Sequence, residues 1–164
     1  MEFIFEKMSE KHEISVMDIF NYYVENSFAA YPEEHLPYET YNLFLNMTRG
    51  YPAYVLKEND NDKVIGFCFL RAYNPLPAFK ETAEVTYFFD PETTGKGIGK
   101  KALEKLEKEG KEMGIKHILA NVSSKNENSI RFHLKNGFYE SGRFKNVAVK
   151  NSETFDVVWL QKDL

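Results

Sequence analysis

Residues 84–107 read EVTYFFDPETTGKGIGKKALEKLE, and this stretch contains the strand, turn and helix from which the architecture can be predicted. Its opening residues are mostly β-branched or aromatic, which predicts a strand over 83–89 that Asp90-Pro91 closes. The turn at 95–99, Gly-Lys-Gly-Ile-Gly, then opens a helix whose apolar side comprises Ile98, Ala102, Leu103, Leu106 and Met113. A glycine-rich turn between a strand and a helix presents free backbone N–H groups at the positive helix end, which favours a phosphate ligand.

Three ligand classes use such a turn, and the spacing of the residues separates them. A Walker-A loop fails, because its first glycine would fall on Thr94 and its magnesium-binding hydroxyl on Lys101. A dinucleotide fingerprint fits residues 97–102, but the acid that should bind the ribose is absent from 117–122, HILANV. The third class is the pyrophosphate of coenzyme A.

The charge of the helix agrees with an anionic ligand without requiring one. Seven lysines and four glutamates lie between residues 96 and 116, so this segment carries +3 in a chain of formal net charge -4. Such a local bias attracts anions. The same run also fits a solvated helix face with i,i+4 ion pairs, and the charge alone leaves both explanations open.

The rest of the chain alternates strand and helix patterns around this segment. The expected strands are residues 2–8, 53–58, 63–73, 83–89, 117–123, 139–150 and 154–161. The expected helices are residues 14–27, residues 38–48, a helix that residues 95–99 open and Gly114 ends, and a short helix through Ile130 and Leu134 that Gly137 ends. The order β-α-α-β-β-β-α-β-α-β-β predicts a mixed α/β or α+β layer fold, with residues 1–164 in one domain.

Composition and charge exclude several classes of protein. With 21 Lys plus Arg against 25 Asp plus Glu, the chain lacks the basic surface on which general nucleic-acid binding depends. The single cysteine, Cys68, excludes an intrachain disulfide and suits a reducing compartment. No apolar run reaches the roughly 18 residues of a membrane span, and the first residues lack a signal-peptide layout. We therefore expect a soluble, cytoplasmic protein with no nucleic-acid or membrane partner.

Two segments together resemble a known family. Residues 84–107 resemble the acetyl-CoA-binding segment of the GCN5-related N-acetyltransferase (GNAT) family, and NENSIRFHLKNGF, residues 126–138, resembles its second cofactor-contact segment. Four further segments resemble the phosphinothricin acetyltransferase branch: YPAYVLKE (51–58), VIGFCF (64–69), PAFKETAEVTYF (77–88) and FDVVWLQKDL (155–164). The resemblance implies a GNAT-type fold, in which a central mixed, mostly antiparallel twisted sheet is flanked by helices and splays near its middle.

The resemblance also implies roles for individual residues, with acetyl-CoA as the cosubstrate. Glu84 matches the proposed general base of the branch, and His133 stands where much of the wider family has a tyrosine thought to protonate the leaving thiolate. The residues implied to contact the cofactor are Tyr87, Phe88, Phe89, Thr94, Gly95, Lys96, Gly97, Ile98, Gly99, Asn126 and Ser129. The family usually has glutamine or arginine at the position of Thr94, so one side-chain donor to phosphate is missing while the backbone cradle remains.

Direct acetyl transfer needs a neutral amine, because an ammonium ion has no lone pair with which to attack a thioester. Glu84 can accept the amine's proton, directly or through a water; the alternative is a solvated glutamate at the start of a strand. For His133, an acid, a substrate-orienting group and a structural residue remain alternatives. Cys68 lies in the apolar run VIGFCFL, which favours core filling over an acetyl-enzyme route. His12, His35 and His117 lack partners at metal-ligand spacing, so we expect no metal site.

Four residues are candidates for the acceptor pocket, with a place in the core as the alternative: Phe28, Tyr31, Arg71 and Tyr73. Tyr31-Pro32 and Ser152-Glu153-Thr154 stand where branch members often have an arginine or Gly-Arg-Trp, so phosphinothricin should be at best a poor substrate. We predict an N-acetyltransferase that moves the acetyl group of acetyl-CoA to the primary amine of a small, amino-acid-like acceptor by direct attack. The alternatives are a protein or peptide amine acetyltransferase and a non-catalytic acyl-CoA-binding sensor, and a homodimer is left open.

Overall fold

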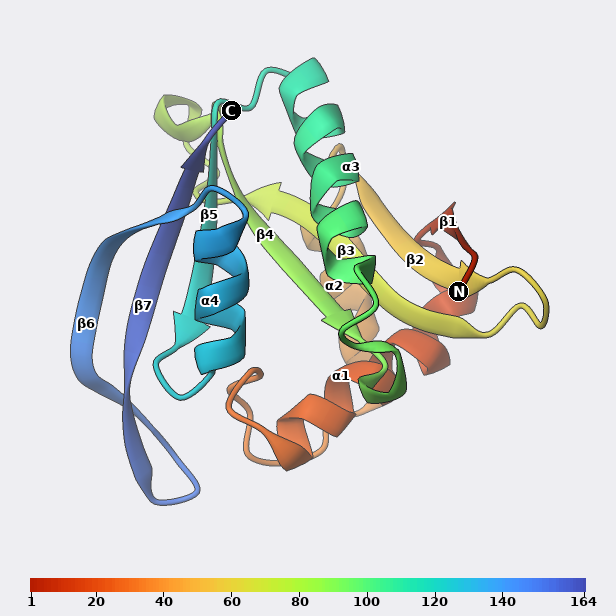
Figure 1. Ribbon diagram of the computed structural model, residues 1–164, viewed down its shortest axis with the longest axis horizontal. Helices are drawn as coiled ribbons and strands as arrows, with labels where there is room; N and C mark the ends of the chain where they lie inside the picture. The colour runs from red at the N-terminus through yellow and green to blue at the C-terminus, as the bar shows by residue number, and fades with distance from the viewer.

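Seven strands form a single sheet in the order β1-β2-β3-β4-β5-β7-β6 in a computed structural model that describes residues 1–164 (Figure 1). The strands are β1 (Phe3–Lys7), β2 (Ala53–Glu58), β3 (Val64–Ala72), β4 (Thr82–Phe89), β5 (His117–Ser123), β6 (Tyr139–Lys150) and β7 (Glu153–Asp163). The helices are α1 (Glu13–Asn26), α2 (Tyr41–Met47), α3 (Ile98–Glu112) and α4 (Glu127–Lys135), with short 3-10 turns at Glu10–His12, Tyr38–Thr40, Pro77–Phe79 and Pro91–Thr93. All neighbouring strands are antiparallel except β4 and β5. The predicted mixed, mostly antiparallel fold and the predicted order of elements are confirmed.

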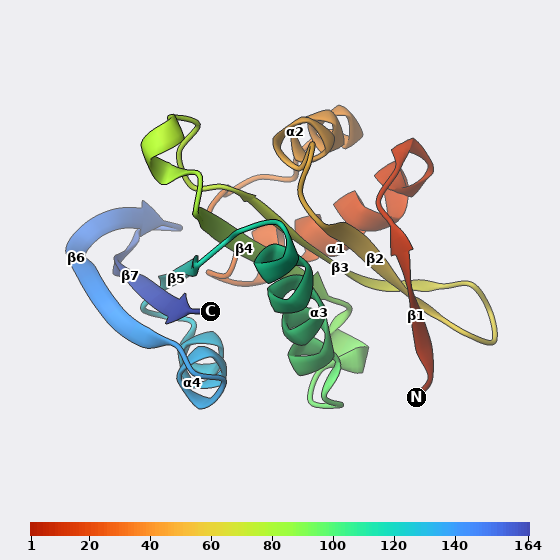
Figure 2. The same ribbon diagram turned by 90° about the horizontal axis from the view of Figure 1, so that it is seen from above.

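Helices cover both faces of the sheet, with α1 and α2 on one face and α3 and α4 on the other (Figure 2). Strand β3 contributes to both faces, because alternate residues of a strand point in opposite directions. Phe67 and Phe69 pack in the smaller core beside α1 and α2, while Cys68 and Leu70 pack in the larger core beside α3. This double burial explains why β3 is a continuous apolar run rather than an alternating one.

The sheet opens at its middle, between β4 and β5. These parallel strands pair only from Thr82 with His117 to Glu84 with Leu119, although β4 continues to Phe89 and β5 continues to Ser123. Each strand stays paired with its other neighbour, β4 with β3 and β5 with β7, so the two halves of the sheet diverge beyond this junction (Figure 1). The edge of β4 beyond Glu84 therefore has no strand partner, and a gap opens beside it.

Two apolar residues of the helical segments are exposed: Met113, which the sequence pattern placed on the apolar side of its helix, and Leu134. Met113 lies one residue beyond the last turn of α3, where Gly114 at φ +94° turns the chain away. Leu134 is exposed because α4 turns the neighbouring His133 inward, against the ring of Phe138.

No helix of the structure combines the length and the apolar character that crossing a membrane requires.

Strands β6 and β7 form a long hairpin at one edge of the sheet. Its turn residues, Asn151 and Ser152, both have positive φ, as the two-residue turns of hairpins require. The pairing register of β6 shifts between Phe144 and Ala148, which marks an irregularity that bends the strand. Most of β6 is exposed, but its last residue, Lys150, is completely buried.

Candidate active site

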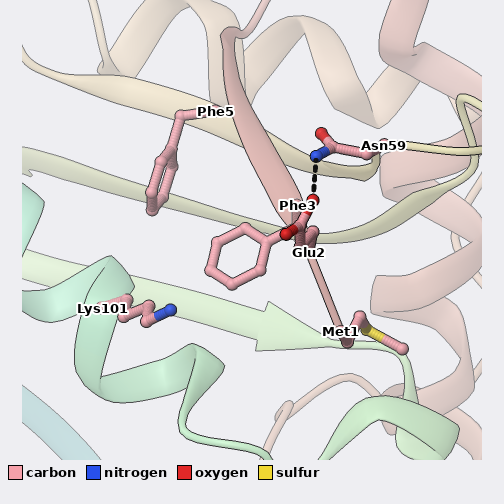
Figure 3. Close-up of a pocket in the computed structure, with 6 residues that line it drawn as sticks. All are labelled: Met1, Glu2, Phe3, Phe5, Asn59 and Lys101. Carbon is pink, nitrogen blue, oxygen red and sulfur yellow. Dashed lines mark hydrogen bonds between the residues drawn. The ribbon is translucent and has the colours of Figure 1, made fainter.

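A cleft of about 1300 Å³ passes through the gap between β4 and β5. One end lies among the turn before α3 and the start of α4, and the other lies among α1, α2 and the loop that follows α1. The cleft therefore joins the two faces of the sheet at the place where the strands separate. A smaller pocket of about 280 Å³ lies beside β1, lined by Met1, Glu2, Phe3, Phe5, Asn59 and Lys101 (Figure 3), and it shares no residue with the cleft.

The turn before α3 supplies an anion cradle at the first end of the cleft. Gly95 and Gly97 have φ of +79° and +77°, in the left-handed region that favours glycine. Lys101 donates its N–H to Gly97 O, so the N–H groups of the first turn before it have no partner within the helix. A Cβ at Gly97 would meet no atom within 4 Å, so backbone conformation rather than crowding calls for glycine there. This arrangement fits the pyrophosphate of acetyl-CoA.

Most of the cofactor residues that the resemblance implied line the cleft. From the turn these are Thr94, Gly95, Gly97, Ile98 and Gly99, whereas Lys96 is outside the lining and Lys100 takes part in it. The hydroxyl of Thr94 donates to Pro91 O, at 3.0 Å. Asn126 and Ser129 line the cleft at the start of α4, where Asn126 Oδ1 accepts the N–H of Ser129 and caps the helix.

Strand β4 contributes its unpaired edge to the cleft through Tyr87, Phe88 and Phe89. Their side chains alternate, so Phe88 packs against Phe20 of α1 while the rings of Tyr87 and Phe89 stack on the α3 and α4 face. The hydroxyl of Tyr23 donates to Phe89 O. The open backbone of this edge suits hydrogen bonding to an extended amide-containing chain, although the carbonyl of Phe89 already has a partner.

His133 is a neutral, internally satisfied residue in this geometry. Its Nδ1 lies 2.6 Å from Ser129 O, and because a carbonyl only accepts, Nδ1 carries the hydrogen. Its Nε2 accordingly accepts a hydrogen bond from the Tyr87 hydroxyl. Burial lowers the pKa of His133 to about 4, and the side chain is only 2% exposed. Nε2 therefore carries no hydrogen that His133 could donate to a group in the cleft, which favours an orienting role for His133 over that of an acid.

An ion pair marks the other end of the cleft. Arg71 and Glu84 face each other across β3 and β4, with Arg71 Nη2 3.0 Å from Glu84 Oε1. The Glu84 side chain is 12% exposed and that of Arg71 is 36% exposed, so both remain open to the cleft. Nε of Arg71 is buried without a hydrogen-bond partner. The guanidinium has unused donors that can bind an anion, and the carboxylate beside it can accept hydrogen bonds from an ammonium or amine.

Tyr31 closes this end of the cleft from the loop after α1. Its hydroxyl donates to Asn121 Oδ1 on β5, and its ring lies against Phe155. Burial, together with the charge of Glu84, raises the pKa of Tyr31 to about 12. The hydroxyl thus stays protonated and acts as a hydrogen-bonding group.

The structure separates the four acceptor candidates into two groups. Arg71 and Tyr31 line the cleft, whereas Phe28 packs on Phe155 and Tyr73 packs between Phe79 and Trp159, outside it. Several lining residues were not singled out from the sequence: Phe20, Tyr23, Phe44, Met47, Phe69 and Asn121. Only Asn121 had a signal, as a polar residue inside the apolar strand HILANVS, because the others look like ordinary core residues at helix and strand spacing.

Cys68 lies in the core and outside the cleft lining. Burial raises the pKa of its thiol far above the usual value, which suppresses the thiolate that a nucleophile needs. The structure contains no group of three histidine, cysteine, aspartate or glutamate residues arranged to hold a metal ion.

Comparison with known proteins identifies similar sequences and folds. A model of the acetyltransferase (GNAT) family matches residues 16–138. The L-methionine sulfoximine/L-methionine sulfone acetyltransferase of Salmonella typhimurium is 31% identical over 115 residues, which cover 70% of this chain and 66% of that protein. A phosphinothricin acetyltransferase from Sinorhizobium meliloti, solved with AcCoA, superposes with a TM-score of 0.92 at 25% identity, covering 100% of this chain and 89% of that one. A ribosomal-protein-alanine N-acetyltransferase from Brucella melitensis superposes with a TM-score of 0.89 at 27% identity, covering 98% and 99%.

Proposed function

This chain belongs to the acetyltransferase (GNAT) family, and from that premise we propose that it transfers the acetyl group of acetyl-CoA to the α-amine of a small amino acid with an apolar side chain. The observation that carries the proposal is the pairing of Arg71 with Glu84 at one end of a cleft whose other end is an anion cradle. In this arrangement the turn at Thr94–Gly99 holds the pyrophosphate, and Asn126 and Ser129 lie along the pantetheine arm.

Glu84 and Arg71 divide the recognition of the acceptor's two polar groups. The Arg71 guanidinium binds the carboxylate of the amino acid through the terminal N–H donors that Glu84 leaves free. Glu84 takes a proton from the ammonium and so frees the lone pair that attacks the thioester. Because the two side chains face each other directly in the β3–β4 register, an α-amino acid can reach both.

The apolar residues at this end of the cleft fit the acceptor's side chain. Phe20, Phe44, Met47, Phe69 and Phe88 line it from α1, α2, β3 and β4. Burying an aliphatic or aromatic side chain against them contributes about 25 cal/mol per Å² of apolar surface removed from water. A charged side chain would instead lose hydration without gaining a partner.

This distribution of charge disfavours phosphinothricin. That molecule carries a phosphinate in addition to its carboxylate, and Arg71 is the one cationic residue at the acceptor end of the cleft. The other two cationic lining residues, Lys100 and Lys135, lie on α3 and at the end of α4, toward the cofactor end. One guanidinium that already holds Glu84 cannot neutralise two further anions.

The similarity to a ribosomal-protein-alanine N-acetyltransferase favours a second candidate, an acceptor that is the N-terminus of a protein. A peptide has no carboxylate next to its reacting amine, so it leaves Arg71 without that anion. The role of Arg71 therefore separates the two candidates.

A thiol-release assay with matched acceptors tests the proposal. Phenylalanine and methionine should react with kcat/KM at least about tenfold above phenethylamine, methioninamide and an N-terminal alanine peptide, and phosphinothricin should react poorly. Replacing Arg71 with Gln should remove this preference by raising KM for the amino acid. Equal rates with and without the carboxylate would reject the amino-acid acceptor, and preference for the peptide would establish the second candidate.

A further inference from the structure

The last residue of β6, Lys150, is the most deeply buried charged side chain in the protein, with 0% of its surface exposed. Lysine is almost never fully buried, because its ammonium loses the water that solvates it. No carboxylate forms an ion pair with this ammonium. Its solvation must therefore come from another source.

Three backbone carbonyls surround the ammonium. Nζ of Lys150 donates to Val24 O, Ser27 O and Ala30 O, each at 2.7 Å. An ammonium has three N–H donors, so all of them are satisfied. Val24 O belongs to the last turn of α1 and Ser27 is its C-cap, where unpaired carbonyls and the helix dipole favour a cation.

The segment that these bonds hold is the loop after α1, residues 27–33, which we term the acceptor loop. Ala29, Ala30, Tyr31 and Pro32 line the cleft, and Tyr31 reaches across to Asn121. A further hydrogen bond joins the β6–β7 hairpin to the acceptor loop, because the N–H of Asn151 donates to Glu33 Oε1 at 2.7 Å. The turn of the β6–β7 hairpin and the loop after α1 lie at the same end of the molecule in Figure 1.

We propose that Lys150 is a positioning residue that fixes the acceptor loop, and with it the Tyr31 wall of the cleft, without touching either substrate. The three donors of Nζ join the last turn of α1, through Val24 O, to the start and the middle of this loop, through Ser27 O and Ala30 O. The cofactor cradle lies on the other face of the sheet and makes no contact with Lys150, so the effect is confined to the acceptor. The acceptor part of this inference rests on the proposed function.

Replacing Lys150 with Met tests the inference, because methionine fills the space and removes the three donors. We expect the KM for the amino acid acceptor to rise at least about tenfold, with the KM for acetyl-CoA changed by less than about twofold. Amide hydrogen exchange at residues 28–33 should become faster, while residues 95–100 keep their rates. Lys145→Met is the matched control, since it removes the same charge from an exposed position on the same strand.

A second variant keeps the test decisive if Lys150→Met does not fold. Glu33→Ala removes the hydrogen bond to Asn151 and the nearby negative charge that favours the Lys150 ammonium, and it should shift the same two readouts in the same direction by a smaller factor. Faster exchange is measured without any acceptor, so it tests Lys150 even if no amino acid is acetylated and the proposed function fails. Unchanged exchange at 28–33 in both variants, or equal rises in both KM values, would overturn the inference.

Discussion

Glu84 and Arg71 lie directly opposite each other on β4 and β3, and their chemistry depends on that register. Glu84 shares its strand face with Thr86 and Phe88, which places its carboxylate on the acceptor side of the sheet while Tyr87 faces the cofactor side. A one-residue change of register would exchange the two sides. The proposed base is therefore positioned by strand pairing rather than by a flexible loop.

Glu84→Gln tests the proton acceptor, because it keeps the size of the side chain and removes its basicity. The rate at neutral pH should fall by about 10²–10⁴-fold, the range that a positioned base contributes. The defect should shrink as pH approaches the pKa of the amine, where the free amine carries its own lone pair. Glu81→Gln is a suitable control, since Glu81 pairs with Lys116 just before β4, away from the cleft. An equally large defect at every pH, or weaker acetyl-CoA binding as its whole cause, would reject the base.

Sequence patterns and resemblance indicate single site residues, but they do not predict the contacts between residues that lie far apart in the sequence. Glu84 was found through its resemblance to a family position, and Arg71 could be singled out as a polar residue at the end of an apolar strand. The contact of Tyr31 with Asn121 joins residues 90 positions apart, so no local pattern carries it. His133 matched a family position, but its tautomer follows from Ser129 O and Tyr87, which only the folded chain brings together.

Among the elements, the helices and strands could be predicted because their signals are local. Apolar periodicity gave the order of all eleven, and glycines at 97, 114 and 137 mark the ends of α3 and α4 with positive φ. The end of α1 has no local signal of this kind in the sequence. It has no glycine, and its last carbonyls are satisfied by Ser27 and by a lysine 126 residues later in the chain.

The turn before α3 makes a prediction about cofactor binding. Gly97→Val places a β-branched residue at φ +77°, which distorts the turn and misaligns its N–H groups. Affinity for coenzyme A should fall at least about tenfold, or about 1.4 kcal/mol, by isothermal titration calorimetry. Gly114→Val imposes the same kind of strain at φ +94° in open space at the far end of α3, so it should cost stability and keep the affinity. A folded Gly97→Val protein that binds normally would contradict the cradle.

At the scale of the whole molecule, the proposed sites of the two substrates lie on opposite faces of the sheet. The cofactor cradle belongs to the α3 and α4 face, the acceptor pocket belongs to the α1 and α2 face, and the two meet only at the gap between β4 and β5. This division follows from the early end of the β4–β5 pairing, which the resemblance implied and which composition or periodicity could not have shown.

This architecture predicts direct transfer within a ternary complex. Both substrates reach the gap from opposite faces, so double-reciprocal plots should intersect rather than run parallel. Mass spectrometry after incubation with acetyl-CoA alone should detect no acetylated protein, because Cys68 is buried outside the cleft and burial keeps its thiol protonated. Parallel lines together with a stable acetylated protein would instead require a covalent intermediate.

The three residue pairs that join β4 to β5 also have a thermodynamic consequence. Strands β1–β4 and β5–β7 form two halves of the sheet that share few strand hydrogen bonds, and the larger core beside α3 spans both halves, so the junction is an opening in the hydrogen bonding of the sheet rather than in its core. A ligand whose amide groups line the free edge of β4 extends the hydrogen bonding across that opening. Because such a ligand binds only the folded chain, at 100 times its Kd it raises the free energy of unfolding by about 2.7 kcal/mol. The bound cosubstrate thus supplies hydrogen-bond partners that the sheet itself lacks at this edge, and the free energy of unfolding should rise with the concentration of acetyl-CoA.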